Sequence, residues 1–194
     1  MKRLFVGVWP PAEVLDRLAV LARPEIRGLR WTDRRQWHVT LRFHGPVDEV
    51  APVRAALAGV EAAGEITAAA LGPAVGCFGR RILHVPVMGL DALAAAVIAA
   101  TAHLGKPPDD RPFSGHVTLA RVAKDARVDL RSLTGVPVEA EWEVGAVCLV
   151  ESRLAPAAAR YEVLEELALR PRLRPGAGAG APAHPRDGEP RRTS

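Results

Sequence analysis

Segments in which apolar and polar residues alternate, separated by segments with apolar residues three and four apart, run through residues 1–169. The alternation predicts β-strands and the longer spacing predicts amphipathic helices, with glycine and proline pairs at most boundaries. The predicted strands cover residues 2–9, 37–44, 65–77, 82–87, 116–122, 138–151 and 160–167, and the predicted helices cover 12–21, 48–63 and 91–104. We expect Gly45 and Pro46 to end the second strand, and a short polar helix or turn to lie near 125–133.

The order of these elements indicates a chain made of two similar halves, because each half has a strand that carries the same tetrapeptide. A chain of 194 residues, 48% of them hydrophobic, can bury a core as one domain or as two closely packed lobes. Residues 170–194 are rich in proline, glycine, alanine and arginine and contain almost no large apolar side chain. We therefore predict a folded part over residues 1–169 and a disordered tail over 170–194.

Several classes of protein are disfavoured by the composition. No apolar run reaches the roughly 18 to 20 residues of a membrane span, and the first apolar stretch ends at Pro10-Pro11. Cys77 and Cys148 are too few for a disulfide framework and lack metal-ligand spacing, so we expect two buried free thiols. We expect a cytoplasmic protein that binds no membrane, metal or cofactor and acts as a monomer.

The basic composition gives only weak support for a nucleic-acid partner. The net charge is +4, but the residues from Pro171 onward hold five arginines and two acidic residues. The chain before Pro171 therefore has 21 basic and 20 acidic residues and is nearly neutral. Five arginines cluster around the first tetrapeptide: Arg27, Arg30, Arg34, Arg35 and Arg42. Solvated surface positions explain most of them as well as a nucleic-acid contact does.

The repeated tetrapeptide is the feature that carries chemistry. His38-Val39-Thr40-Leu41 and His116-Val117-Thr118-Leu119 both lie in predicted strands. Because successive side chains of a strand point to opposite faces, each histidine shares a face with its threonine, and each valine shares the other face with its leucine. If the two strands lie side by side, two imidazoles and two hydroxyls converge on one small volume, with the apolar residues in the core.

Two histidines and two threonines suit acid-base chemistry on a phosphodiester. Histidine, with an ordinary pKa near 6.5, can protonate a leaving oxygen or take a proton from water near neutral pH. The threonine hydroxyls can donate hydrogen bonds to non-bridging oxygens as negative charge develops. A single His-x-Thr is more often structural, but the shared strand context and shared faces favour a paired site.

The sequence around both tetrapeptides also resembles a known family. Trp-His-Val-Thr-Leu-Arg-Phe at 37–43 and Pro-Phe-Ser-Gly-His-Val-Thr-Leu-Ala-Arg at 112–121 look like the two signature motifs of the 2H phosphoesterases. More narrowly, the chain is similar to the bacterial and archaeal RNA 2',3'-cyclic phosphodiesterases, historically called 2'-5' RNA ligases. The resemblance covers residues 1 to about 169, including Arg30-Trp31 and the segment Ala159-Arg160-Tyr161.

The resemblance implies an α/β (α+β) fold of two pseudo-twofold lobes, with mainly antiparallel sheets lining a central cleft and helices outside. It implies that His38 protonates the leaving 3' oxygen and that His116 activates water, which leaves a 2'-phosphomonoester on RNA. Thr40 and Thr118 would hold the phosphate. Arg121 matches a frequent family position and is a candidate phosphate contact, for which its rigid fork of donors is suited.

Alternation along the first motif strand adds weaker candidates. Arg42 falls on the face of His38 and Thr40, which makes it a candidate contact to the substrate backbone, and His44 falls there as a partly exposed strand-end residue. Phe43 or Phe78 is a candidate for stacking on a base, although core packing is expected for at least one of them. No chemistry is assigned to His84 or His103.

Other functions remain open at this level. The same machinery could cleave or join a 2'-5' linkage or open a cyclic phosphate on a small nucleotide, because pocket shape decides which ester reacts. A noncatalytic module that binds RNA ends is the alternative from another class, and it would tolerate loss of either histidine. No His-Glu-x-x-His, compact Cys/His cluster or Gly-x-x-x-x-Gly-Lys loop points to metal or nucleotide-triphosphate chemistry.

Overall fold

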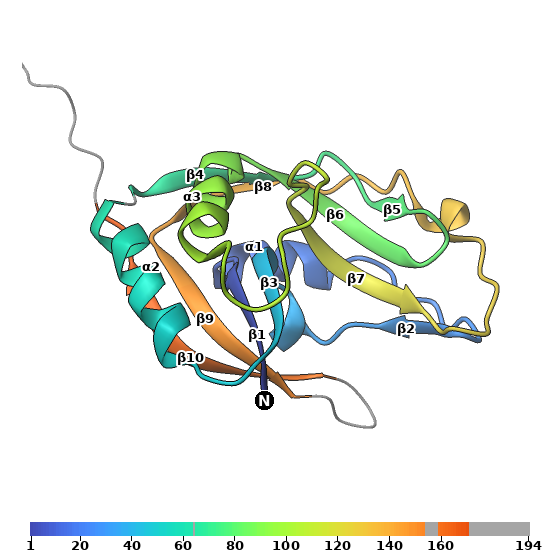
Figure 1. Ribbon diagram of the computed structural model, residues 1–194. Helices are drawn as coiled ribbons and strands as arrows, with labels where there is room; N and C mark the ends of the chain where they lie inside the picture. The colour runs from blue at the N-terminus through green and yellow to red at the C-terminus, as the bar shows by residue number, and fades with distance from the viewer. Residues whose placement is uncertain (64, 154–158, 171–194) are drawn as a thin grey trace, which may run out of the picture.

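Strands β3 (Val39–Val47) and β7 (His116–Val122), which follow or contain the two His-x-Thr motifs, lie next to each other in the middle of a curved sheet (Figure 1). The computed structural model describes residues 1–63, 65–153 and 159–170. The other strands are β1 (Lys2–Val8), β2 (Leu29–Trp31), β4 (Thr67–Leu71), β5 (Gly76–Phe78), β6 (Ile82–Met88), β8 (Ala140–Val144), β9 (Ala146–Arg153) and β10 (Arg160–Ala168). The helices are α1 (Ala12–Ala19), α2 (Ala51–Ala63) and α3 (Asp91–Thr101), with 3-10 turns η1 (Arg34–Gln36) and η2 (Leu130–Leu133).

The strands follow the order β10-β9-β1-β3-β7-β6-β4-β8, with β2 beside β7 and β5 beside β6. The named strands pair in an antiparallel manner throughout this path. β3 and β7 share one bridge, between Val39 and Val117. The expected antiparallel α+β architecture is confirmed. The two motif strands are neighbours in the middle of the order, with β10, β9 and β1 on the side of β3 and β6, β4 and β8 on the side of β7.

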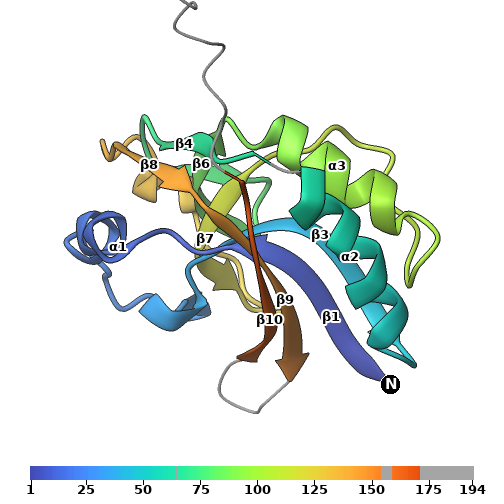
Figure 2. The same ribbon diagram turned by 90° about the vertical axis from the view of Figure 1, so that its left-hand side faces the viewer.

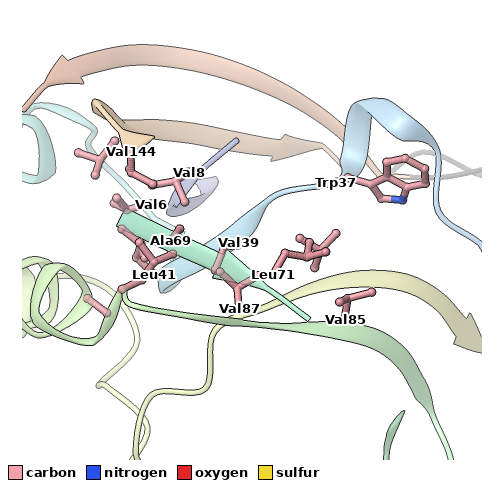
Figure 3. Packing of buried hydrophobic residues seen from close by; sticks show 14 of the residues in the cluster. Val6, Val8, Trp37, Val39, Leu41, Ala69, Leu71, Val85, Val87 and Val144 are labelled. Carbon is pink, nitrogen blue, oxygen red and sulfur yellow. The ribbon is translucent and has the colours of Figure 1, made fainter. Parts of the chain in front are cut away.

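The apolar residues of both motifs lie in the core, as the alternation predicts. Val39, Leu41, Val117 and Leu119 are at most 3% exposed, whereas the histidines and threonines between them are partly exposed. Figure 3 shows Val39 and Leu41 among Ala69 and Leu71 of β4 and Val85 and Val87 of β6. Burial of each such valine or leucine contributes roughly 1.5–3 kcal/mol, so the core fixes the face on which the polar motif residues lie.

The three helices lie outside the curved sheet (Figure 2). α2 and α3 pack side by side near β3 and β10, and α1 lies on the opposite side near β8. α1 follows Pro11 and buries Val14 and Leu18, as expected for a helix that begins after a proline pair. None of the helices in the described residues is long and apolar enough to cross a membrane.

Several predicted boundaries are wrong, and each has a local cause. β3 continues through Gly45 and Pro46 to Val47, and Pro46 pairs with Arg3 of β1. Because β7 no longer pairs with β3 at this place, the N–H that proline lacks is not needed. The predicted strands 65–77 and 138–151 are each two strands, divided near Gly72-Pro73 and at Gly145. β2 was not predicted, since three residues are too few for a periodic pattern. The tail from residue 171 onward lies outside the described residues.

Candidate active site

His38 is held by the short turn that precedes β3. Asp33 caps η1 in a capping box, in which its side chain accepts from the Arg35 backbone and the Gln36 side chain accepts from the Asp33 backbone at 2.9 Å. The Gln36 carbonyl then accepts a hydrogen bond of 2.6 Å from Nδ1 of His38. Because Nδ1 carries the proton, Nε2 of the neutral ring is an acceptor and faces the Thr40 hydroxyl at 3.1 Å.

Three aromatic rings surround the His38 imidazole. Its centroid lies 4.7 Å from the ring of Phe5, 5.1 Å from that of Trp9 and 5.0 Å from that of Tyr161. Gly7 makes room for this packing, because a Cβ there would lie 2.8 Å from the Val39 carbonyl oxygen and 3.5 Å from the His38 ring. Burial among these rings lowers the pKa of His38 from 6.5 to about 4, with smaller lowering contributions from His116 and Arg121.

His116 is oriented by the same kind of backbone contact. Its Nδ1 donates to the Ser114 carbonyl at 2.8 Å, which leaves Nε2 free to face the pocket. The rings of Phe78 and His84 contact it edge to face, with centroids 4.8 Å and 5.5 Å away. Burial lowers the pKa of His116, and the charge of Arg121 lowers it further. Each imidazole is therefore neutral at neutral pH, and in both rings Nδ1 is held by a backbone carbonyl, which leaves Nε2 as the second nitrogen.

The pairing of β3 with β7 sets the arrangement of the four motif side chains. Val39 lies opposite Val117 in an antiparallel register. In such a register, the residue before Val39 lies opposite the residue after Val117, and the residue after Val39 lies opposite the residue before Val117. His38 is therefore across from Thr118, and Thr40 is across from His116. The two imidazoles therefore occupy opposite corners of a small rectangle, with the hydroxyls at the other two corners.

Hydrogen bonds of Thr32 link the segment before the first motif to the second motif strand. Its hydroxyl donates to the carbonyls of Thr118 and Leu119 at 2.7 and 2.9 Å and accepts from the indole nitrogen of Trp37 at 3.0 Å. Its backbone nitrogen donates to the Leu119 carbonyl at 2.8 Å. Since Trp37 precedes His38 directly, this one residue connects the backbone of β7 to the segment that carries the first histidine.

A cavity of about 500 Å³ opens over these side chains. Arg3, Arg30 and Arg121 lie in its wall, and no aspartate or glutamate is among the described residues that line it. Arg30 and Arg121 are cross-strand partners on β2 and β7, and the Arg3 guanidinium lies 4.8 Å from the Phe43 ring centroid. Three guanidinium groups without a carboxylate make this cavity suited to an anion such as a phosphate.

The cavity gathers six of the seven predicted site residues: His38, Thr40, Phe43, His116, Thr118 and Arg121. The prediction that Arg42 shares their face is wrong. The pairing of β3 with β1 skips Leu41 and His44, so the strict alternation fails at both positions. Thr40 and Phe43 consequently face the cavity, whereas Arg42 is 5% exposed and donates to the Lys106 carbonyl at 2.7 Å.

The prediction for His44 as a partly exposed strand-end residue is also wrong. The side chain is fully buried, and its Nδ1 contacts the Leu104 carbonyl at 3.2 Å. His84 is buried as well and stacks on Phe78 with centroids 3.8 Å apart, although sequence reasoning assigned it no role. Burial lowers the pKa of both histidines, that of His84 to about 4, and the charge of His116 adds to the effect on His84.

Sequence reasoning missed several residues of the site: Arg3, Phe5, Trp9, Thr32, Gln36 and Tyr161. Only one of them had a local signal, the Asp33-x-x-Gln36 spacing of a capping box. The others come from elements far away in the sequence, and Tyr161 of β10 reaches the site only because β10, β9, β1 and β3 are neighbours. Among the described residues, no three His, Cys, Asp or Glu side chains are grouped so that they could hold a metal ion.

The sequence profile of the 2'-5' RNA ligase superfamily matches residues 10–156, which is most of the chain. The chain belongs to the 2'-5' RNA ligase superfamily. The predicted resemblance to the 2H phosphoesterases is thereby confirmed at the level of the superfamily. This superfamily acts on phosphodiesters by hydrolysis or ligation, which makes the protein an enzyme of phosphodiester chemistry. No curated protein sequence matches this chain.

Solved structures agree with this membership in the 2'-5' RNA ligase superfamily. TT0787 of Thermus thermophilus is 30% identical, with a TM-score of 0.73 over 88% of this chain and 100% of that chain. E. coli LigT complexed with NADP+ is 25% identical, with a TM-score of 0.67 over 87% of this chain and 98% of that chain. The PDE domain of MHV ns2, 14% identical with a TM-score of 0.50 over 77% of this chain and 99% of that chain, shares the fold.

Proposed function

We propose that this protein hydrolyses RNA ends that carry a 2',3'-cyclic phosphate to 2'-phosphomonoesters, by acid-base catalysis with His38 and His116 and without a metal ion. The observation that carries the proposal is the cavity that two imidazoles, two threonine hydroxyls and three arginines line together, with no carboxylate among the described residues of its wall. The superfamily membership supports phosphodiester chemistry, and the paired motifs support the narrower reaction.

In the proposed reaction, water attacks the phosphorus as the bond to the 3' oxygen breaks. His116 takes the proton of the water at Nε2, and His38 gives a proton from Nε2 to the departing 3' oxygen. The 2' oxygen keeps the phosphorus, so the product is a 2'-phosphomonoester and a free 3' hydroxyl. The diagonal arrangement of the histidines suits this assignment, because the attacking and leaving oxygens lie roughly in line across the phosphorus.

Thr40 and Thr118 are proposed to donate hydrogen bonds to the non-bridging oxygens, where negative charge develops. Arg121 supplies a fixed positive charge beside both imidazoles, since its charge lowers the pKa of His38 and of His116. Such preorganised donors stabilise the transition state more than the ground state in a site from which water is excluded.

The protonation states also follow from the pocket. His38 is neutral in the free enzyme at neutral pH, because burial lowers its pKa to about 4. Arrival of the anionic cyclic phosphate favours the imidazolium and raises this pKa, so the proton that His38 must donate is acquired together with the substrate. His116 is the base and benefits from a lowered pKa, since it must be neutral before water attacks.

Crystal structures of E. coli LigT are described as complexes with 3'-AMP, NADP+, ATP and phosphate. The ligands are all phosphates, and three of them are adenine nucleotides. By analogy, a nucleotide end is a fitting substrate for the cavity of this protein.

The decisive experiment is product analysis. An RNA ending in a 2',3'-cyclic phosphate is incubated with the enzyme in excess EDTA, and the position of the product phosphate is determined by NMR or by sensitivity to specific phosphatases. We expect a 2'-phosphate, formed at full rate in EDTA. A 3'-phosphate product, or activity lost in EDTA and restored by a metal ion, would contradict the proposal.

Variants of each histidine test their roles in the same assay. H38A and H116A should each lower kcat by roughly 10²- to 10⁴-fold, the range for a positioned acid or base. H103A is the matched control, because His103 is exposed and lies outside the cavity. If H38A or H116A kept turnover and RNA binding together, a noncatalytic RNA-end-binding module would be the better description.

A further inference from the structure

A basic groove of about 840 Å³ lies at the end of the sheet where β6 begins and β7 ends, apart from the cavity that holds the two motifs (the motif cavity). One wall of the groove is the turn between β5 and β6, residues 79–81. The other wall is the segment 124–131, which follows β7 and includes the start of η2. Figure 1 shows this segment turning back from the end of β7 towards β5.

The charges of the basic groove are not neutralised. Five of its eleven lining residues are basic, and all five are exposed: Arg80, Arg81, Lys124, Arg127 and Arg131. Two acidic residues, Asp125 and Asp129, line it as well, and the Asp129 side chain caps η2 by accepting a hydrogen bond of 3.1 Å from the backbone nitrogen of Arg131. Within the described part of the chain, none of the five basic side chains forms an ion pair. The groove therefore offers positive charge to a ligand.

Arg81 holds the two walls of the groove together. Its guanidinium donates to the carbonyls of Ala123 and Lys124 at 2.8 and 2.7 Å, and its own carbonyl accepts from the backbone nitrogen of Val122 at 2.9 Å. A guanidinium has five N–H donors, so the two bonds to carbonyls leave others for an anion. Because the side chain is already ordered, contact with an anion costs little additional conformational entropy.

The basic groove begins close to the motif cavity. Ile82, the residue after Arg81, is the cross-strand partner of Arg121, and Arg30 pairs with Arg121 from the other side. Arg30 and Arg121 both line the motif cavity. Since neighbouring residues of a strand are roughly 3.3 Å apart, arginines continue from the motif cavity to the groove. A polyanion that extends from the motif cavity along these strands reaches the groove.

The composition of the groove indicates which part of an RNA suits it. A cavity of about 500 Å³ has the size of a small-ligand site, so most of an RNA substrate lies outside the motif cavity. No aromatic side chain is among the described residues that line the basic groove. Proteins usually bind single strands by adding aromatic rings to a positive groove, whereas they bind double-stranded RNA through its phosphates and 2'-hydroxyls. Positive charge without rings favours the backbone of base-paired RNA.

We propose that the basic groove binds the phosphate backbone of a base-paired RNA stem whose unpaired 3' end lies in the motif cavity. The inference rests on the proposed function and names its class of substrate, which is folded RNA with a short unpaired end. Phosphate contacts set the position of the stem and carry no sequence information. The groove thus selects for the presence of a stem and not for its sequence.

Turnover is compared on three RNAs that end in a 2',3'-cyclic phosphate. They are a hairpin with two unpaired nucleotides at its 3' end, a single strand of the same length and composition that cannot pair, and a dinucleotide that reaches only the motif cavity. R80A/R127A removes two exposed charges of the basic groove. R17A/R54A is the matched control, because it removes two exposed charges from α1 and α2, outside the described walls of the groove and of the motif cavity. Circular dichroism verifies that each variant is folded.

We expect R80A/R127A to raise KM for the hairpin by roughly tenfold or more, with kcat unchanged, because the lost contacts bind the ground state and the transition state equally. The rise should be smaller for the single strand and absent for the dinucleotide. R17A/R54A should behave like the wild type on all three RNAs.

The salt dependence of binding provides a second measurement. The Kd of a 5'-labelled hairpin is measured by fluorescence anisotropy in the H38A protein, so that no turnover occurs. Each phosphate contact contributes about 0.9 to the slope of log Kd against the logarithm of the salt concentration, so R80A/R127A should reduce this slope by about 2.

Three results would overturn the inference. An equal rise in KM for the hairpin and the single strand in R80A/R127A would place an unpaired strand in the groove. An equal effect of R17A/R54A on the hairpin would reduce the effect to the overall charge of the protein. An unchanged salt slope in R80A/R127A would exclude contacts from these two residues to phosphates.

The two proposals fail in different ways. If the wild-type enzyme opened none of the three RNAs, the proposed function would be wrong, and the Kd and salt slope of the hairpin would still test the groove. If the dinucleotide were opened as proposed but R80A/R127A left KM for the hairpin unchanged, the stem-binding groove would be wrong.

Discussion

Replacing His84 should make the protein more tolerant of acid. His84 is 6% exposed, stacks on Phe78, and has a buried Nδ1 with no hydrogen-bond partner among the described residues. Burial lowers its pKa from 6.5 to about 4, and the charge of His116 lowers it further. Between these two values the unfolded chain takes up a proton at this position and the folded chain does not, so stability decreases as the pH falls from 6.5 to 4.

The size of this effect follows from the same two values. At pH 5 the ordinary imidazole of the unfolded chain is almost fully protonated and the buried one is almost fully neutral. The difference destabilises the folded state by about 2 kcal/mol relative to pH 8. H84F removes the titrating group and keeps a ring that can stack on Phe78, and H84L removes both. The decrease in stability from pH 8 to pH 5 should therefore be about 2 kcal/mol smaller in both variants than in the wild type.

The assay is urea unfolding followed by tryptophan fluorescence at pH 8 and at pH 5. Comparing the two pH values within each protein separates the protonation effect from any change in packing caused by the new side chain. H103Q, at an exposed histidine, should behave like the wild type. An equal decrease in the wild type, H84F and H84L would refute the reasoning, because it would mean that His84 takes up its proton in the folded state as readily as in the unfolded chain.

Three further predictions concern the motif strands. The profile of kcat/KM against pH should be bell-shaped with its maximum below pH 6.5, because the reaction needs neutral His116 and protonated His38 and both residues have a lowered pKa in the free enzyme. The kcat profile should lie at higher pH, because bound phosphate raises the pKa of His38. If the two profiles coincided, phosphate would not raise the pKa of His38. T118V should lower kcat/KM by about 10²-fold with little change in urea midpoint, and an unchanged rate would remove Thr118 from the proposed site. G115A should destabilise the protein by about 1–3 kcal/mol and slow turnover, because its Cβ would lie 2.3 Å from the Val87 carbonyl oxygen and displace the start of β7. G59A in α2, where a Cβ meets nothing within 4 Å, is its control and should be neutral or stabilising in the same urea titration.

The sequence was most informative where local pattern and tertiary environment agree. The prediction of 116–122 matches β7 at both ends, and the apolar residues of both motifs are buried as their alternation requires. The shared strand context and shared faces favoured a pairing of the two His-x-Thr motifs, and the resemblance to the 2H phosphoesterases implied it. The strand limits and the buried faces depend on neighbours in the chain, so a single sequence contains enough information to predict them.

Arg42 and His44 show why the rest could not be predicted. Their faces depend on two irregularities in the pairing of β3 with β1, which a count of alternating positions along β3 cannot detect. The rings around His38 are equally inaccessible to local reasoning, because Phe5, Trp9 and Tyr161 reach it through the order of strands in the sheet. Thr32 has no pattern of its own, and its role depends on the carbonyls of β7.

The single Val39–Val117 bridge between β3 and β7 has a consequence for how this enzyme can be divided. Each of these two strands, with the residue before β3, supplies one imidazole and one hydroxyl, so a fragment containing either motif alone has half of the proposed reactive groups. Two fragments cut between the motifs could regain turnover only by reassociating, through the pairs β1–β9 and β2–β7 as well as β3–β7. The rate of turnover by such a split pair would then measure the association of the two fragments as it occurs.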